Sequence, residues 1–466
     1  MGGFVFGYTY IFNNLGSFAE VITGVLGIAI TVVAIVVELA ATRYTPKITD
    51  LFIKEKINLI VLPFYIFLCI VSIWIAGFQG AKELSAVRAI VLVYLGLVSV
   101  SFLTIIPYFY YIFRFLRPQN IISKLENQVI RILESSLNSN TNIATHKAQL
   151  FTTIEQISDI GINSISSLDR SLGLASIDSL KNILLYYFRL KDRLPAGWFA
   201  INEDNFLGFS KISTRKIEAD HTWVEMAVLK QFEFIFSKAV KTIREMVQEI
   251  SNTTKEIALV AIRARRQETA QLLVIYFNTF LRISLNEKDQ YAAYNLFDQY
   301  RLLAEETMTI DPNLTLEIAN YFKYYGQLAL NLQLPFILET AAHDLRVLNE
   351  KAYQVGFSAI SELLEVFLRV DKPPGSRFEE VALRGVRKSQ AILASFYLLH
   401  NEEALARRIY DDMKLEPWER LCSIRDEILN VEKERFWELT DRWVNFDYVD
   451  PKRKEKLKEF FTWFKS

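Results

Sequence analysis

Three long apolar runs occupy the first quarter of the chain, whereas polar and charged positions recur throughout the rest. The runs cover residues 19 to 41, 58 to 78 and 87 to 113, and their few charges lie near their ends. A helix of about 20 residues, rising about 1.5 Å per residue, crosses a hydrocarbon core of about 30 Å. Each run therefore predicts a transmembrane helix, and residues 19 to 116 predict a transmembrane domain.

The segment before the first run, residues 1 to 18, is rich in aromatic side chains at every second position, from Phe4 to Phe12. Aromatic residues concentrate at the headgroup level of a bilayer, so this segment is expected to lie at the interface. A plug or re-entrant element at the outer mouth is the alternative. Residues 1 to 19 contain no Lys or Arg, which favours a permanent first helix over a cleaved signal peptide.

Basic residues mark the expected cytoplasmic side of the membrane. Those predicted at this interface are Arg43, Lys47, Arg114 and Arg117, which follow the first and third runs. The connection between the second and third runs carries fewer basic residues. Because Lys and Arg accumulate on the cytoplasmic side, this pattern places the N-terminus outside and everything after the third run in the cytoplasm.

From residue 117 onward, apolar residues recur mainly at helical spacing. We expect an all-α membrane protein, in which three N-terminal transmembrane helices precede a large cytoplasmic α-helical domain. Residues 117 to 285 would form a helical domain with a stalk and a loop or hairpin near 192 to 216. Residues 286 to 466 resemble helical repeats, including a helix over 416 to 445. A solenoid and an irregular bundle both remain open.

Composition separates the two parts of the chain. The whole sequence is 51% hydrophobic and has a formal net charge of zero. Residues 1 to 120 contain 8 basic and 5 acidic side chains, and the remainder contains 45 and 48. Such a balance provides no basic field for nucleic acid, so none is expected as a partner. Cys69 and Cys422 do not suggest a disulfide framework.

Sequence patterns of known catalytic sites are missing. The chain contains no GxxxxGK[ST] phosphate loop, no HExxH, no CxxC pair and no GxSxG. Asp220, His221 and Glu225 could supply half of a metal site, but a capped helix start with a solvated face explains them better. We therefore expect no enzyme, no metal and no cofactor.

Small and polar residues in the first run share one helical face. The predicted face, for a pore or for helix packing, comprises Glu20, Thr23, Gly24, Gly27, Thr31 and Glu38, with Ala34 between the last two. Small residues allow helices to pack closely, whereas carboxylates and hydroxyls can line a water-filled path for cations. An ionisable group near the membrane is costly and usually faces an interior. Glu38 could instead pair with Arg43 or lie hydrated at the interface.

Two functions follow from this architecture. The first is an oligomeric ion channel or transporter-like protein, since three spans are too few to enclose a path and a symmetric homo-oligomer would be required. Its cytoplasmic helical domain would sense a signal or direct assembly. The alternative is a membrane-anchored scaffold or receptor whose helical domain binds a cytoplasmic protein. The aromatic-rich C-terminal segment, from Trp418 to Phe464, is a candidate groove, although aromatic residues at helical spacing are usually core.

A family resemblance rests on two stretches. Residues 37 to 47 (VELAATRYTPK) end the first run with a small and polar stretch followed by Tyr44, Thr45, Pro46 and a basic residue. Residues 117 to 122 (RPQNII) follow the last run. Together they resemble the prokaryotic membrane-protein family catalogued as domain of unknown function 2254, over residues 20 to about 125 and more faintly to about 240. The resemblance implies a prokaryotic cytoplasmic membrane protein. It implies no mechanism, and the family's Ser-Pro and Asn-Asp motif is replaced here by Ser166, Ser167, Leu168 and Asp169.

Overall fold

The computed structural model describes residues 14–43, 48–77, 85–138, 142–201, 210–370, 377–436 and 442–465. The chain forms two compact units. The first comprises residues 1–131 and 155–179, and the second comprises residues 132–154 and 180–466. Most of the predicted interfacial segment, residues 1 to 13, lies outside the described residues. The domain boundary at residue 286 stays a prediction.

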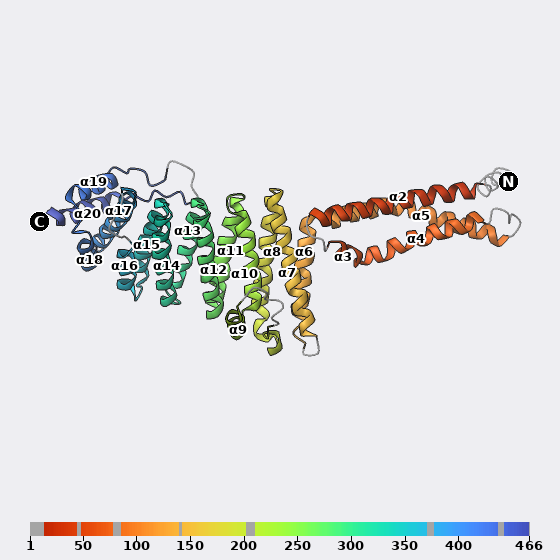
Figure 1. The fold of residues 1–466 in the computed structure, drawn as a ribbon, viewed down its shortest axis with the longest axis horizontal. Helices are drawn as coiled ribbons and strands as arrows, with labels where there is room; N and C mark the ends of the chain where they lie inside the picture. The colour runs from red at the N-terminus through yellow and green to blue at the C-terminus, as the bar shows by residue number, and fades with distance from the viewer. Residues whose placement is uncertain are drawn as a thin grey trace. The chain divides into compact units, whose positions relative to one another are not determined.

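The first unit contains the apolar helices. They are α2 (Leu15–Arg43), α4 (Lys56–Gly77) and α5 (Ser85–Phe115), with the short α3 (Ile48–Ile53) between the first two (Figure 1). Three stretches are long and apolar enough to cross a membrane, namely Ala19–Thr42, Lys56–Gly77 and Ala89–Phe115. The described residues contain no strand, so the predicted all-α class with three N-terminal apolar helices is confirmed.

Tyrosine hydroxyls join α4 to α5 at three levels. The pairs are Tyr94 with Ser72 at 2.9 Å, Tyr108 with Asn58 at 3.1 Å and Tyr65 with Thr104 at 3.2 Å. Lipid provides no hydrophobic driving force between helices, so packing and such interhelical hydrogen bonds hold them together. The Phe, Tyr and Leu residues of these runs predict spans. They do not predict which tyrosines face a neighbouring helix.

We expect Tyr94→Phe to weaken the contact between α4 and α5. Tyr94 is buried, and its hydroxyl donates to Ser72 Oγ. Interhelical hydrogen bonds of this kind contribute about 0.6 kcal/mol on average and at most about 1.7. Reversible unfolding in lipid bicelles measures the loss. Tyr110→Phe is the matched control, since Tyr110 is 66% exposed; equal losses in the two variants would contradict the assignment.

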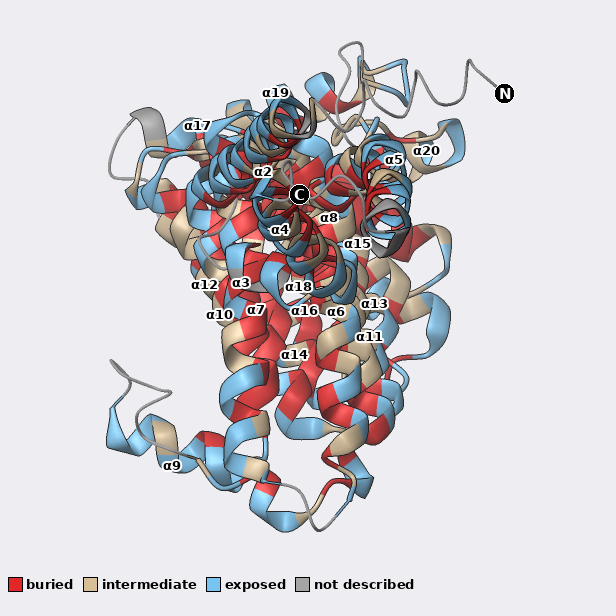
Figure 2. Ribbon diagram, turned by 90° about the vertical axis from the view of Figure 1, so that its right-hand side faces the viewer, coloured by how far each residue is buried: buried red, intermediate tan, exposed pale blue. Residues whose placement is uncertain are grey.

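The remaining helices follow one another along the chain. Their bounds are α6 Pro118–Ser135, α7 Ile143–Ser166, α8 Arg170–Leu190, α9 Lys211–Ala219, α10 Trp223–Ala239, α11 Arg244–Arg263, α12 Gln267–Asn286, α13 Gln290–Thr307, α14 Pro312–Asn331, α15 Pro335–Val355, α16 Ile360–Leu368, α17 Arg377–Leu399, α18 Glu403–Met413, α19 Trp418–Leu429 and α20 Pro451–Thr462. From α10 to α17, most helices pack against both the next helix and the next but one. This arrangement stacks helices in two layers, as in an α-solenoid. Figure 2 shows buried positions, in red, along helices such as α14.

The turns between stacked helices use left-handed residues other than glycine. Arg265, Lys288 and Gln333 each have φ between 55° and 64° and lie two residues after the last residue of a helix. At Lys288 the turn is closed by Asp289 N–H donating to Ser284 O at 2.9 Å, which is the Schellman pattern. The Asp289 carboxylate then accepts from Ala292 N–H and caps α13. Short turns of this kind hold successive helices antiparallel.

The predicted helix over residues 416 to 445 is wrong beyond Leu429, where α19 ends. We call residues 430–450 the return segment; its described residues contain no helix. Arg442 Nη1 lies 2.6 Å from Asp344 of α15, and Phe446 stacks on His343 with 3.9 Å between ring centroids. Asp447 accepts from Lys388 of α17 at 2.6 Å. These tertiary contacts outweigh the helical propensity of the segment.

The region predicted as a loop or hairpin, near 192 to 216, contains short turns. Two 3-10 turns, Lys191–Arg193 and Ala196–Trp198, lead to residue 201, and α9 begins at Lys211. Trp198 is buried, and its carbonyl accepts from Trp223 Nε1 at 2.8 Å. Residues 202–209 lie outside the described part of the chain.

Candidate functional site

Helix α2 has three faces of different character. Buried residues, among them Ile22, Leu26 and Val33, point toward α4 and α5. Exposed large aliphatic residues form a second face, with Ile28 67% and Leu39 64% exposed. Such residues suit contact with lipid. The third face carries the small and polar residues predicted as a site.

We call this third face the α2 stripe. It consists of Glu20, Gly24, Gly27, Thr31, Ala34 and Glu38, all exposed within one chain. A Cβ placed on Gly24 or Gly27 would meet no atom within 4 Å, so neither glycine is explained by packing inside the unit. Thr31 Oγ1 donates to Gly27 O at 2.9 Å, along its own helix. Thr23, also predicted for this face, is half-buried and lies at the edge of the stripe.

The spacing of the α2 stripe is regular. Its positions are separated alternately by four and three residues, which is the seam of a left-handed pair or bundle of helices. At about 100° per residue, the stripe lies roughly 140° around the helix from the buried face. Glu20 and Glu38 are about 27 Å apart along the axis at about 1.5 Å per residue. Their carboxylates therefore lie toward opposite ends of the candidate span Ala19–Thr42.

The predicted interface cations fall at the ends of apolar helices. Arg43 is the last residue of α2, and Lys47 lies outside the described residues. Arg114 and Arg117 lie at the end of α5 and in the turn after it, and both are exposed. The pairing of Glu38 with Arg43 stays a prediction, because the Arg43 side chain lies outside what the structure describes.

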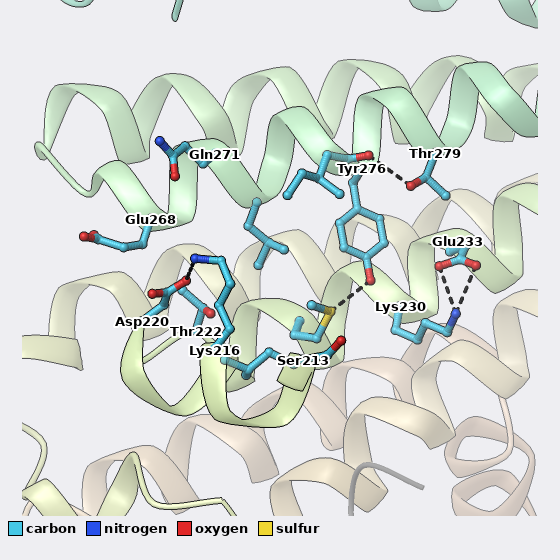
Figure 3. Close-up of a pocket in the computed structure, with 14 residues that line it drawn as sticks. Ser213, Lys216, Asp220, Thr222, Lys230, Glu233, Glu268, Gln271, Tyr276 and Thr279 are labelled. Carbon is cyan, nitrogen blue, oxygen red and sulfur yellow. Dashed lines mark hydrogen bonds and ion pairs between the residues drawn. The ribbon is translucent and has the colours of Figure 1, made fainter. Parts of the chain in front are cut away.

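A groove in the second unit was not predicted from the sequence. Helices α9, α10 and α12 enclose it, with Ile217, Met226 and Leu272 among its apolar residues (Figure 3). Ile275 is 51% exposed at its edge. Tyr276 donates to Met226 Sδ at 3.2 Å, and burial raises the pKa of its phenol. The apolar side of α9 was a signal, but α12, which completes the groove, begins only at Gln267 and is distant in sequence.

The charged residues around this groove are mostly paired. Lys216 bridges to Asp220 at 2.8 Å, and Lys230 bridges to Glu233 at 3.0 Å, as Figure 3 shows. Glu268 is the remaining acidic residue of the groove and makes no ion pair with another described residue. The rim is therefore slightly negative around an apolar floor.

Asp220, His221 and Glu225 do not converge. His221 stacks on Phe199 with 4.2 Å between ring centroids. Glu225 is fully buried and accepts from Lys191 at 2.5 Å and from Thr269 at 3.1 Å. Among the described residues, no three His, Cys, Asp or Glu side chains are grouped so that they could hold a metal ion. These residues hold helices together.

Most aromatic residues of the C-terminal segment pack internally. Phe460 and Phe461 are buried, and Phe464 lies 4.8 Å from Tyr410 between ring centroids. Trp418 and Trp443 are 40% and 51% exposed. The described part of the segment provides separate exposed rings around a packed core.

Comparison with known proteins supports the membrane assignment. Residues 11–166 match the model of a family described as "Predicted membrane protein (DUF2254)", which confirms the resemblance predicted from the sequence. No curated protein matches the chain. A solved structure titled "Circular tandem repeat protein with novel repeat topology and enhanced subunit contact surfaces" is 14% identical, with a TM-score of 0.32, over 76% of this chain and 91% of its own. A similarity that weak carries no argument about function.

Proposed function

We propose that this chain, which matches a family of predicted membrane proteins over residues 11–166, is a homo-oligomeric channel-like protein whose α2 stripes surround a cation path. The observation that carries the proposal is the exposure of the whole stripe within one chain. A carboxylate facing lipid is costly, so Glu20 and Glu38 favour an environment of protein and water. Copies of the same helix around a symmetry axis would provide it.

The geometry of the α2 stripe suits such an axis. Gly24, Gly27 and Ala34 let neighbouring backbones approach closely, and the alternating spacing fits a left-handed helix bundle. Rings of Glu20 and Glu38 at the two ends would attract cations and repel anions. Thr31 would present its hydroxyl oxygen near the middle. The aliphatic face with Ile28 and Leu39 would remain toward lipid.

The proposed orientation follows the basic residues. Arg114 and Arg117 end the third candidate span, and the positive-inside tendency favours a cytoplasmic helical domain and an outer N-terminus. We propose location in the cytoplasmic membrane of a prokaryote, consistent with the family resemblance. The stacked helices would then form the part that senses a signal or joins subunits.

Flux through purified protein in liposomes tests the proposal. We expect cation flux in wild type, loss of flux in Thr31→Leu, and unchanged flux in the neighbouring Val32→Leu, since Val32 lies on the aliphatic face. Glu38→Gln is expected to reduce the preference for cations over anions by about tenfold, equivalent to about 1.4 kcal/mol. Wild-type protein that conducts nothing under voltage or osmotic stress, and runs as a monomer after crosslinking in membranes, would refute the proposal.

A second candidate function, a membrane-anchored scaffold, is favoured by the groove between α9, α10 and α12. Its apolar floor suits an apolar helix of a cytoplasmic partner, and Glu268, which makes no ion pair with another described residue, suits a basic residue at the flank of that helix. Ile275→Asp is expected to abolish capture of such a partner, while Ile310→Asp, exposed elsewhere on the same unit, leaves it unchanged. Equal effects of the two variants would count against the groove.

A further inference from the structure

The corner between α5 and α6 forms a polar pocket at the end of the third candidate span. That span ends at Phe115, and α6 begins at Pro118. Asn120 Nδ2 donates to Arg114 O at 2.6 Å, and the Asn120 backbone N–H donates to Arg117 O at 2.9 Å. These bonds fix the corner so that the last turn of α5 and the first turns of α6 line one pocket within a single compact unit.

Two cationic side chains line this pocket. The Arg114 guanidinium is exposed and makes no hydrogen bond or ion pair with another described residue. Lys124 Nζ lies 2.5 Å from Glu55 Oε1 and 4.0 Å from the centroid of the Phe115 ring. Tyr111 donates to the other oxygen of Glu55 at 3.2 Å. Glu55 thus balances one of the two cations, and the pocket keeps one uncompensated positive charge at Arg114.

Part of the pocket wall is apolar. The rings of Tyr111 and Phe115 contribute to its wall. Toward the membrane, α5 exposes Ile106 and Phe113, which are 78% and 57% exposed. Exposed aliphatic and aromatic side chains on a candidate span contact acyl chains. A ligand that combines an anionic head with an apolar tail would satisfy both parts of this surface.

We propose that this pocket binds the phosphate of an anionic phospholipid. The Arg114 guanidinium provides a planar fork of N–H donors that matches two phosphate oxygens, and Lys124 adds a nearby ammonium group. Basic pockets at the ends of membrane helices bind anionic headgroups in this way. A soluble phosphate has the same head chemistry, but the position at the end of a span favours the lipid. The proposal requires the membrane location only, and is independent of whether copies associate through the α2 stripe.

Binding to the full-length protein in a neutral detergent tests this site. The probes are short-chain phosphatidylglycerol, short-chain phosphatidylcholine and inorganic phosphate, measured by titration calorimetry and by native mass spectrometry. We expect phosphatidylglycerol to bind most tightly. Arg114→Gln should weaken its binding about tenfold, equivalent to about 1.4 kcal/mol, because the variant loses hydrogen bonds between two charged groups. Arg114→Lys should bind phosphatidylglycerol with an affinity between those of wild type and Arg114→Gln, since it keeps the charge and loses the planar pair of N–H donors.

Arg117→Gln is the matched control, because Arg117 is exposed three residues away and does not line the pocket. It removes the same charge and should weaken binding by less than about twofold. Ser123→Asp, on an exposed lining residue, should also weaken binding while leaving Arg114 in place. If Arg114→Gln and Arg117→Gln lose affinity for phosphatidylglycerol equally, general charge attraction explains the binding and the proposed site is overturned. Equal affinity for inorganic phosphate, or for phosphatidylcholine, would overturn the assignment to an anionic lipid.

Discussion

Replacing Asp344 by alanine is expected to lower the free energy of unfolding of the helical domain by about 3 to 5 kcal/mol. Asp344 of α15 is fully buried. Its Oδ1 atom lies 2.6 Å from Arg442 and 3.3 Å from Arg301. Removing the carboxylate leaves two guanidinium groups in the interior with fewer partners. Chemical denaturation followed by circular dichroism in detergent measures the change.

Glu306→Ala provides the control for this prediction. Glu306 and its partner Arg263 are 55% and 62% exposed and lie 3.4 Å apart. Exposed pairs of this kind contribute at most about 1 kcal/mol. Asp344→Asn should fall between wild type and Asp344→Ala, since it keeps one acceptor oxygen without the charge. If Asp344→Ala costs no more than Glu306→Ala, the buried network does not stabilise the domain.

Glu339→Gln is expected to make the helical domain more stable at pH 8 and to change little at pH 5. Burial raises the pKa of the Glu339 carboxyl to about 7, and Asp447 adds to the rise while Lys388 opposes it. The folded state therefore holds a proton that the unfolded state loses above about pH 4.5. Stability must fall as pH rises from about 4.5 to about 7, and then level off. The full shift of the Glu339 pKa corresponds to at most about 3.4 kcal/mol of stability.

Denaturation midpoints at pH 5, 6, 7 and 8 measure this effect. Glutamine stays neutral, so the pH dependence between 5 and 8 should be flatter in Glu339→Gln than in wild type. Glu306→Gln, at an exposed position, removes the same charge and should keep the wild-type profile. The surroundings of Glu339 are crowded, because a Cβ on Gly385 would clash with its side chain. Parallel profiles for wild type and Glu339→Gln would refute the prediction.

The apolar helices could be predicted because their signal is local. Runs of more than 20 apolar residues have few alternatives, and the predicted 58 to 78 corresponds to Lys56–Gly77. Helical spacing also identified the face with Glu20 and Glu38. It could not show that this face is free of α4 and α5, since that depends on where those helices pack.

The longer-range features were not predictable from one sequence. Residues after Leu429 have helical spacing, yet Arg442 and Phe446 pair with Asp344 and His343, about a hundred residues earlier in the chain. The groove likewise depends on α9 lying beside α12. Local helix propensity predicts neither set of contacts, because both depend on the burial and charge of residues that are distant in sequence.

Contacts made by Arg442 of the return segment and by Arg453 of α20 affect how the chain folds during its synthesis. During synthesis, α15 leaves the ribosome well before Arg442 and Arg453. Until those residues follow, Asp344 pairs with Arg301 at 3.3 Å and Glu350 pairs with Arg346 at 2.8 Å, but both lack the later arginines, which lie at 2.6 and 2.8 Å. A nascent chain, or one truncated before Arg442, therefore holds these two acids with fewer partners in an unfinished core, a state that opens readily and that proteases can cleave. Translation through Arg442 and Arg453 completes these pairs, which makes resistance to proteolysis depend on this part of the chain.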